Sequence, residues 1–211
     1  MKDSLTRIAN YLMMNASFQD DLGIFQGKMG CVLFFAHYSR YISQERYAEF
    51  ASELLDEIYA DLNERTPVDF AYGLCGIAWG IEHLVQQDFT QGDTGDILAD
   101  LNEKIMERNP LRIQDLSFEK GLAGIAYYVR THVQSPCAQT RTVDAEYLQS
   151  LETALKTKLP AWSDPRDALK LPDVLSQKMN LLNITDDAKL SVYPLGIAGG
   201  LAGMGLKMMG I

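Results

Sequence analysis

Residues 73–81, GLCGIAWGI, and residues 121–129, GLAGIAYYV, carry the same short pattern. In each copy, two glycines three positions apart are followed by small and apolar residues. Residues 27–35, GKMGCVLFF, and residues 200–206, GLAGMGL, repeat it. A pattern that returns along a chain indicates a repeated structural unit. We therefore treat this Gly-x-x-Gly signature as the feature that decides the fold.

The spacing of the signatures defines the unit. Their first glycines are Gly27, Gly73, Gly121 and Gly200, so the first three are 46 and 48 residues apart and the fourth follows after 79. About 30 additional residues therefore separate the third copy from the fourth. Gly196-Ile-Ala-Gly199 is an equally good start for the last copy, and the sequence leaves that register open.

Two kinds of helix are predicted to alternate along the chain. Each signature begins a nearly uncharged stretch, which predicts a helix buried on most sides. Apolar residues at helical spacing between the signatures predict amphipathic helices with one face in water. These residues are Tyr47, Phe50, Leu54, Ile58 and Leu62, then Ile97, Leu101 and Ile105, then Tyr147, Leu151, Leu155 and Leu159.

This alternation predicts an all-α fold of repeated helical hairpins, a closed or partial α/α toroid formed by residues 1–211 as a single domain. No stretch shows the period-two alternation of a strand. The paired glycines are expected where neighbouring helices or loops come close, since glycine costs about 1 kcal/mol in a helix interior. Four hairpins that do not close would leave an apolar edge, so we expect self-association or a partner that caps this edge.

Composition limits the classes of function. The chain has 211 residues, a net charge of −9 and three cysteines. An acidic chain without a basic stripe is not expected to bind nucleic acid or an anionic membrane. An odd, small number of cysteines favours a reducing compartment, and residues 1–14 lack the apolar core of a signal peptide. The sequence thus predicts a cytoplasmic protein, with no membrane-spanning segment.

The repeated signature, at this period, resembles the lanthionine synthetase C-like family, which includes the lanthipeptide cyclases. The resemblance implies an α/α toroid, although the family's chains are roughly twice as long. Its cyclases hold one zinc ion with two cysteines and a histidine, each just before a Gly-x-x-Gly. The metal activates a peptide cysteine for addition to a dehydrated serine or threonine, as expected of zinc with an open coordination position.

The resemblance places the zinc ligands at three positions of this chain. The family's Trp-Cys-Tyr-Gly corresponds to Phe70-Ala71-Tyr72-Gly73, and its Cys-His-Gly corresponds to Glu119-Lys120-Gly121. Ala71, Glu119 and Lys120 replace all three ligands, and a lysine repels a dication. We therefore predict no catalytic residues, no metal and no cofactor. The expected role is that of a binding or accessory protein in a peptide-modification pathway, which contacts a peptide through Asp69, Tyr72, Glu119 and Lys120.

Two alternatives stay open. An active cyclase would need other metal ligands, but Cys75 and His83 lie eight residues apart, about 12 Å along one helix. A carbohydrate-active or carbohydrate-binding toroid could use paired carboxylates such as Asp69 and Glu119. These two acids also suit the positive ends of the helices that follow them.

Overall fold

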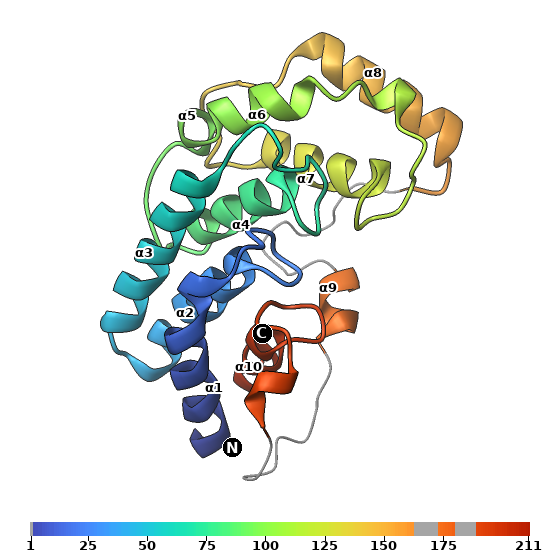
Figure 1. The fold of residues 1–211 in the computed structure, drawn as a ribbon. Coiled ribbons are helices and arrows are strands. Elements are labelled where there is room, and N and C mark those ends of the chain that lie inside the picture. Colours follow the sequence, from blue (N-terminus) through green and yellow to red (C-terminus); the bar gives the residue numbers. More distant parts are fainter. Residues whose placement is uncertain (1, 163–172, 180–188) are drawn as a thin grey trace. The chain divides into compact units, whose positions relative to one another are not determined.

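The computed structural model describes residues 2–162, 173–179 and 189–211, and every regular element in these ranges is helical (Figure 1). The all-α prediction is thus confirmed. Part of the extra stretch before the fourth signature, including Pro165 and Pro172, lies outside the described residues. The contacts divide the chain into two compact units, Arg65–Lys170 and the remainder.

The first unit contains the first and fourth signatures. In it, α2 packs against both α3 and α10, and α1 packs against α10. Lys28, the only lysine buried among the described residues, ties α2 to α3 because its Nζ lies 3.0 Å from Glu57 and 3.1 Å from Asp61. The elements of this unit are α1 (Lys2–Asn15), η1 (Ala16–Phe18), α2 (Lys28–Ile42), α3 (Arg46–Asp61), α9 (Asp173–Lys178), η3 (Leu190–Val192) and α10 (Leu201–Met209).

The second unit contains the second and third signatures. Its two signature helices, α4 and α7, pack against each other, and α6 packs against α4. Lys158 joins the end of α8 to η2 by donating to the carbonyls of Leu111, at 2.8 Å, and Ile113, at 2.6 Å. The elements are α4 (Leu74–Gln86), α5 (Thr94–Ile97), α6 (Ala99–Met106), η2 (Pro110–Arg112), α7 (Leu122–Gln134) and α8 (Ala145–Lys158).

The first glycine of each signature is the N-cap residue of a helix, with an extended backbone. For the fourth copy this residue is Gly200, which resolves the register that the sequence left open. Gly196 lies instead in the preceding loop, where its N–H donates to the carbonyl of Gln26 at 3.2 Å. The structure therefore aligns Gly200 with Gly27, Gly73 and Gly121.

One hydrogen bond recurs at all four signatures. The N–H that follows the first glycine donates to the carbonyl six residues before that glycine, as Leu74 does to Pro67 at 2.8 Å and Leu122 does to Asp115 at 2.9 Å. A Cβ on Gly73 or Gly121 would overlap that same carbonyl. The first glycine of each signature is thus needed where its helix meets the loop that leads into it. The sequence predicted close approach of either a loop or a neighbouring helix, and at this glycine it is the loop.

The signature helices are buried on most sides, as predicted, whereas α3 and α8 bury a single stripe. In α3 only Tyr47, Ala51, Leu54 and Ile58 are buried. The predicted helix through Ile97, Leu101 and Ile105 is wrong in one respect. It breaks at Leu98 into α5 and α6, and Ile97 is 38% exposed.

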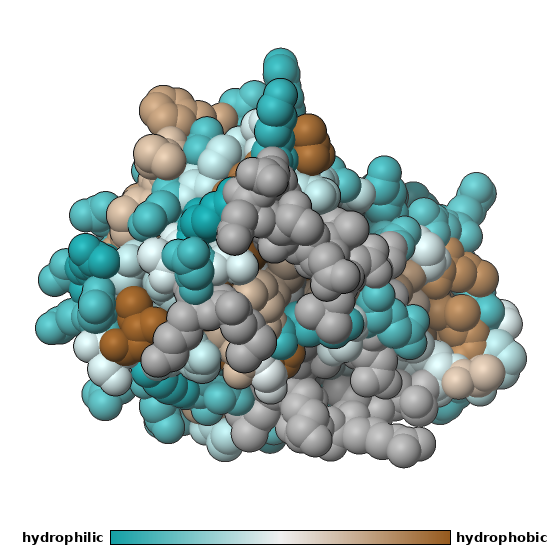
Figure 2. All heavy atoms as spheres, turned by 90° about the horizontal axis from the view of Figure 1, so that it is seen from below, coloured by the Kyte–Doolittle hydropathy of each residue, from teal (hydrophilic) through white to brown (hydrophobic). Residues whose placement is uncertain are grey.

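On the face that Figure 2 shows, apolar side chains lie in small groups among hydrophilic residues. Phe18 is the most exposed large apolar residue of the described ranges, at 85%. No helix of these ranges combines the length and the hydropathy that a bilayer span requires. Self-association and a capping partner stay predictions.

We predict that Gly121→Ala lowers the free energy of unfolding by ~1–3 kcal/mol, because the new methyl group overlaps the Asp115 carbonyl and forces the loop to shift. Gln114→Ala, an exposed change in the same loop, is the matched control and should alter stability by less than about 0.5 kcal/mol. Urea unfolding followed by circular dichroism measures both. Equal losses for the two variants would contradict the role given to the glycine.

Candidate functional site

The loops before the second and third signatures lie side by side. The N–H of Ala71 donates to the carbonyl of Glu119 at 2.9 Å. Each of these residues stands two positions before the first glycine of its signature. The first unit repeats the arrangement, because the N–H of Ala198 donates to the carbonyl of Phe25 at 2.8 Å. Equivalent positions of two hairpins thus meet through main-chain atoms in both units.

An aromatic cluster fixes the loop pair in the second unit. The ring of Phe70 lies 4.7 Å from that of Phe118 and 5.9 Å from that of Tyr127, and Phe118 lies 5.3 Å from Tyr127. Phe70 is fully buried and also contacts the core residue Trp79 at 6.0 Å. The candidate site therefore rests on packed side chains, although its own residues lie in loops.

The four residues predicted to bind a ligand come together at this loop pair. The Nζ of Lys120 lies 5.1 Å from the centre of the Tyr72 ring, a cation–π contact between the two loops. Asp69 uses Oδ1 to accept a hydrogen bond from the N–H of Tyr72 at 2.8 Å. That bond stabilises the turn before α4, so one oxygen of this carboxylate already has a structural partner.

Asp115 is the charged residue with the clearest electrostatic effect in the loop before the third signature. A hydrogen bond from the N–H of Ser117 lowers the pKa of the Asp115 carboxyl, and the charge of Lys120 lowers it further. The N–H of Lys120 donates to the hydroxyl of Ser117 at 3.2 Å. The hydrogen bond from Ser117 and the charge of Lys120 thus both favour the ionised form of this carboxyl.

The residues at the loop pair do not fit a zinc site. Ala71 has no donor atom and is fully buried, and Lys120 brings a positive charge. Of these three residues, Glu119 alone offers an oxygen ligand, whereas zinc in proteins needs three or four protein ligands. In the part of the chain that the structure describes, no three His, Cys, Asp or Glu side chains are grouped so as to hold a metal ion.

The cysteines are equally unsuited to the chemistry of a thiolate. Burial raises the pKa of Cys31 to about 12 and that of Cys75 well above its ordinary value. Burial of His37 lowers its pKa to about 4, and the charge of Arg40 acts in the same direction. All three of these side chains are buried in the core.

The sequence model of the lanthionine synthetase C-like protein family matches residues 18–210. The chain belongs to this family. The family fold is an α/α toroid, which agrees with the helical hairpins described above. No significant match was found among curated proteins or among solved structures.

A buried polar cluster at the far ends of α4 and α7 was missed by the sequence reasoning. Glu82 is fully buried, and its Oε2 lies 2.9 Å from Nδ1 of His132. Its other oxygen accepts hydrogen bonds from Ser135 and, at 3.0 Å, from Gln86. The only signal in the sequence was that Glu82 is the one acidic residue of a long apolar stretch, residues 70–87.

The cluster continues on the other side of the imidazole ring. Nε2 of His132 lies 3.1 Å from Nδ2 of Asn102, and the hydroxyl of Tyr128 donates to Oδ1 of Asn102 at 2.6 Å. The side chains of Ser135 and His132 both bond to Glu82. In a nucleophile–base–acid triad the histidine would instead lie between the serine and the acid, so the order here differs. The cluster fastens α4, α6 and α7 together.

We predict that Glu82→Ala lowers the free energy of unfolding by ~3–5 kcal/mol, because it leaves buried donors and the imidazole without their acceptor. Glu103→Ala, at an exposed position of α6 in the same unit, should change it by less than about 0.5 kcal/mol. Thermal unfolding checks both variants. A small loss for Glu82→Ala would show that the cluster is not a main support of this unit.

Proposed function

We propose that this protein is a zinc-free member of the lanthionine synthetase C-like family that binds a peptide in a peptide-modification pathway. One observation carries the proposal. The main-chain bond between Ala71 and Glu119 brings together the positions that correspond to two zinc-binding cysteines, and neither residue supplies sulfur. Lys120, at the third position, lies over Tyr72.

The side chains present at the loop pair are suited to binding a peptide. Tyr72 offers a half-buried ring, while Glu119 and Lys120 offer a carboxylate and an ammonium group from the neighbouring loop. A peptide carries both hydrogen-bonding amides and side chains that can pack on an aromatic ring. The protein would hold such a peptide without activating a thiol, as an accessory component would.

The purified protein is predicted to contain no stoichiometric zinc and to catalyse no thiol addition within a synthetic peptide that holds a cysteine and a dehydrated serine. Elemental analysis and mass spectrometry with a thiol reagent measure the two properties. A variant with Ala71→Cys, Glu119→Cys and Lys120→His is the positive control, and we expect it to bind about one zinc per chain. Stoichiometric zinc in the unchanged protein would overturn the proposal in favour of a cyclase with other ligands.

A carbohydrate ligand is the second candidate, because the carboxylates of Asp69 and Glu119 come from two loops that are hydrogen-bonded to each other. Two carboxylates at one end of a helical toroid are what a glycosidase requires. The bond from the Tyr72 N–H to Asp69 weakens this reading, since it gives Asp69 a structural role.

Thermal shift separates the two ligand classes. The synthetic peptide is predicted to raise the melting temperature, because a ligand at about 100 times its Kd adds about 2.7 kcal/mol to stability. A panel of neutral and acidic oligosaccharides should leave it unchanged. Lys120→Glu should abolish the shift, and Lys104→Glu, an exposed change of equal charge in α6, should preserve it. A shift with sugars alone would replace the peptide by a carbohydrate.

A further inference from the structure

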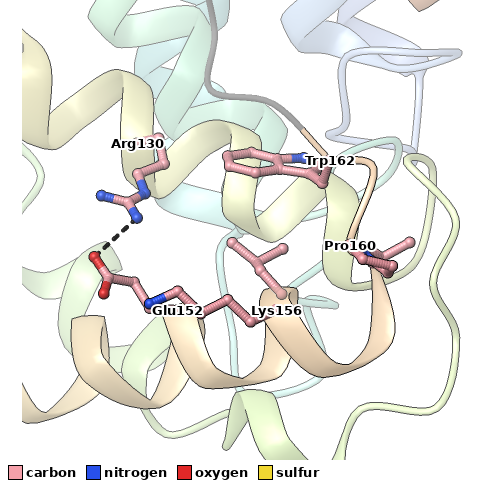
Figure 3. A pocket seen from close by; sticks show the side chains of 7 residues that line it. Arg130, Glu152, Lys156, Pro160 and Trp162 are labelled. Carbon is pink, nitrogen blue, oxygen red and sulfur yellow. Dashed lines mark hydrogen bonds and ion pairs between the residues drawn. The ribbon is translucent and has the colours of Figure 1, made fainter.

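A hollow of about 320 Å³ lies beside α7 and α8, and none of Asp69, Tyr72, Glu119 and Lys120 lines it. Arg130 of α7 and Glu152 of α8 lie at one side of it, and Trp162 and Pro160 lie at the other (Figure 3). Leu155, Lys156 and Leu159 complete the lining. This volume is at the lower end of the range in which small-molecule and peptide side-chain sites are found. Neither the family match nor the proposed function assigns a role to it.

The charged side of the hollow is ordered by an ion pair. A terminal nitrogen of Arg130 lies 3.1 Å from Oε1 of Glu152, and Arg130 is only 21% exposed. Lys156 is exposed and has no ion-pair partner within the described ranges. The lining thus holds two cations and one anion, a local positive excess on a chain whose net charge is −9.

The opposite side is apolar. Trp162 is half-buried and presents its indole to the hollow, next to Pro160 (Figure 3). Leu155 is buried beneath the hollow and Leu159 is half-buried. Tryptophan gives a large, rigid contact area that loses little conformational entropy on binding, so such a wall favours an apolar side chain.

We propose that this hollow binds a peptide segment in which an acidic residue adjoins apolar ones. The carboxylate of the segment pairs with Lys156 and with the guanidinium of Arg130, which Glu152 holds in place. The neighbouring apolar side chain packs on Trp162 and Leu159. Charge complementarity selects the acidic residue, and the indole sets its distance from the apolar one.

This site does not depend on the function proposed for the signature loops. Neither Tyr72 nor Lys120 lines the hollow, so variants of Lys120 and of Lys156 test the two sites separately. Tryptophan fluorescence makes this possible. Of the two tryptophans, Trp79 is fully buried in α4, whereas Trp162 lines the hollow. An added quencher therefore reports on Trp162.

The experiment titrates the protein with the capped peptide acetyl-Leu-Asp-Leu-Phe-amide and follows quenching by acrylamide. Binding is expected to protect Trp162, with an affinity that falls as salt is added. The same peptide with asparagine in place of aspartate should bind about fivefold more weakly, as should the Lys156→Glu variant. Lys104→Glu, at an exposed position of the same unit, is the control and should bind as the unchanged protein does.

Four results would overturn the inference. The first is that the peptide leaves the quenching of Trp162 unchanged. The second is equal binding of the aspartate and asparagine peptides, which would leave an apolar contact without charge selection. The third is that Lys156→Glu and Lys104→Glu weaken peptide binding equally, which would show that binding depends on the net charge of the protein and not on Lys156. Protection of Trp162 by phenylacetate as strong as by the peptide would assign the hollow to a small aromatic acid instead.

Discussion

The structure depends on one main-chain hydrogen bond that is made four times. The N–H after the first glycine of each signature donates to the carbonyl six residues before that glycine. This bond turns the incoming loop back across the start of the helix, and it satisfies one of the donors that every helix leaves unpaired at its N-terminus. Glycine is required because a Cβ would overlap the accepting carbonyl. Each loop is thereby held in the same shape, and two such loops can pair in the same way in both units.

Much of the fold could be predicted from the sequence because its causes are local. The stripe on α3 follows from helical periodicity, and the buried character of α4 and α7 follows from their lack of charge. The break between α5 and α6 could not be predicted in this way. Asp93 caps α5 by accepting from Gly95 at 2.9 Å, and it also binds the backbone of Thr140 at 3.0 Å. Thr140 is far from Asp93 along the chain, so their contact produces no periodic pattern of apolar residues in the sequence.

The candidate site could be predicted only in part from the sequence. The correspondence of Ala71, Glu119 and Lys120 with the ligand positions came from the resemblance and stays a prediction. What the structure adds is a main-chain hydrogen bond between Ala71 and Glu119. The register of the fourth signature was not predictable, because Gly196 and Gly200 have equivalent sequence contexts. The choice is made by the loop of the first signature, where Phe25 accepts from Ala198 and Gln26 accepts from Gly196. Only the folded chain brings these residues together.

The two ends of α4 and α7 constrain the sequence in opposite ways. At the signature end, the loops pair through the N–H of Ala71, which any residue other than proline can supply, and the carbonyl of Glu119, which any residue can supply. Side chains at these positions can therefore change without loss of the pairing. At the other end, Glu82, His132 and Ser135 meet through side-chain atoms inside the core. A change there leaves a buried polar group without its partner. At the signature end the loops are joined by main-chain atoms and supported by the rings of Phe70, Phe118 and Tyr127, so the side chains of residues 71 and 119 are free to vary while the hairpins remain.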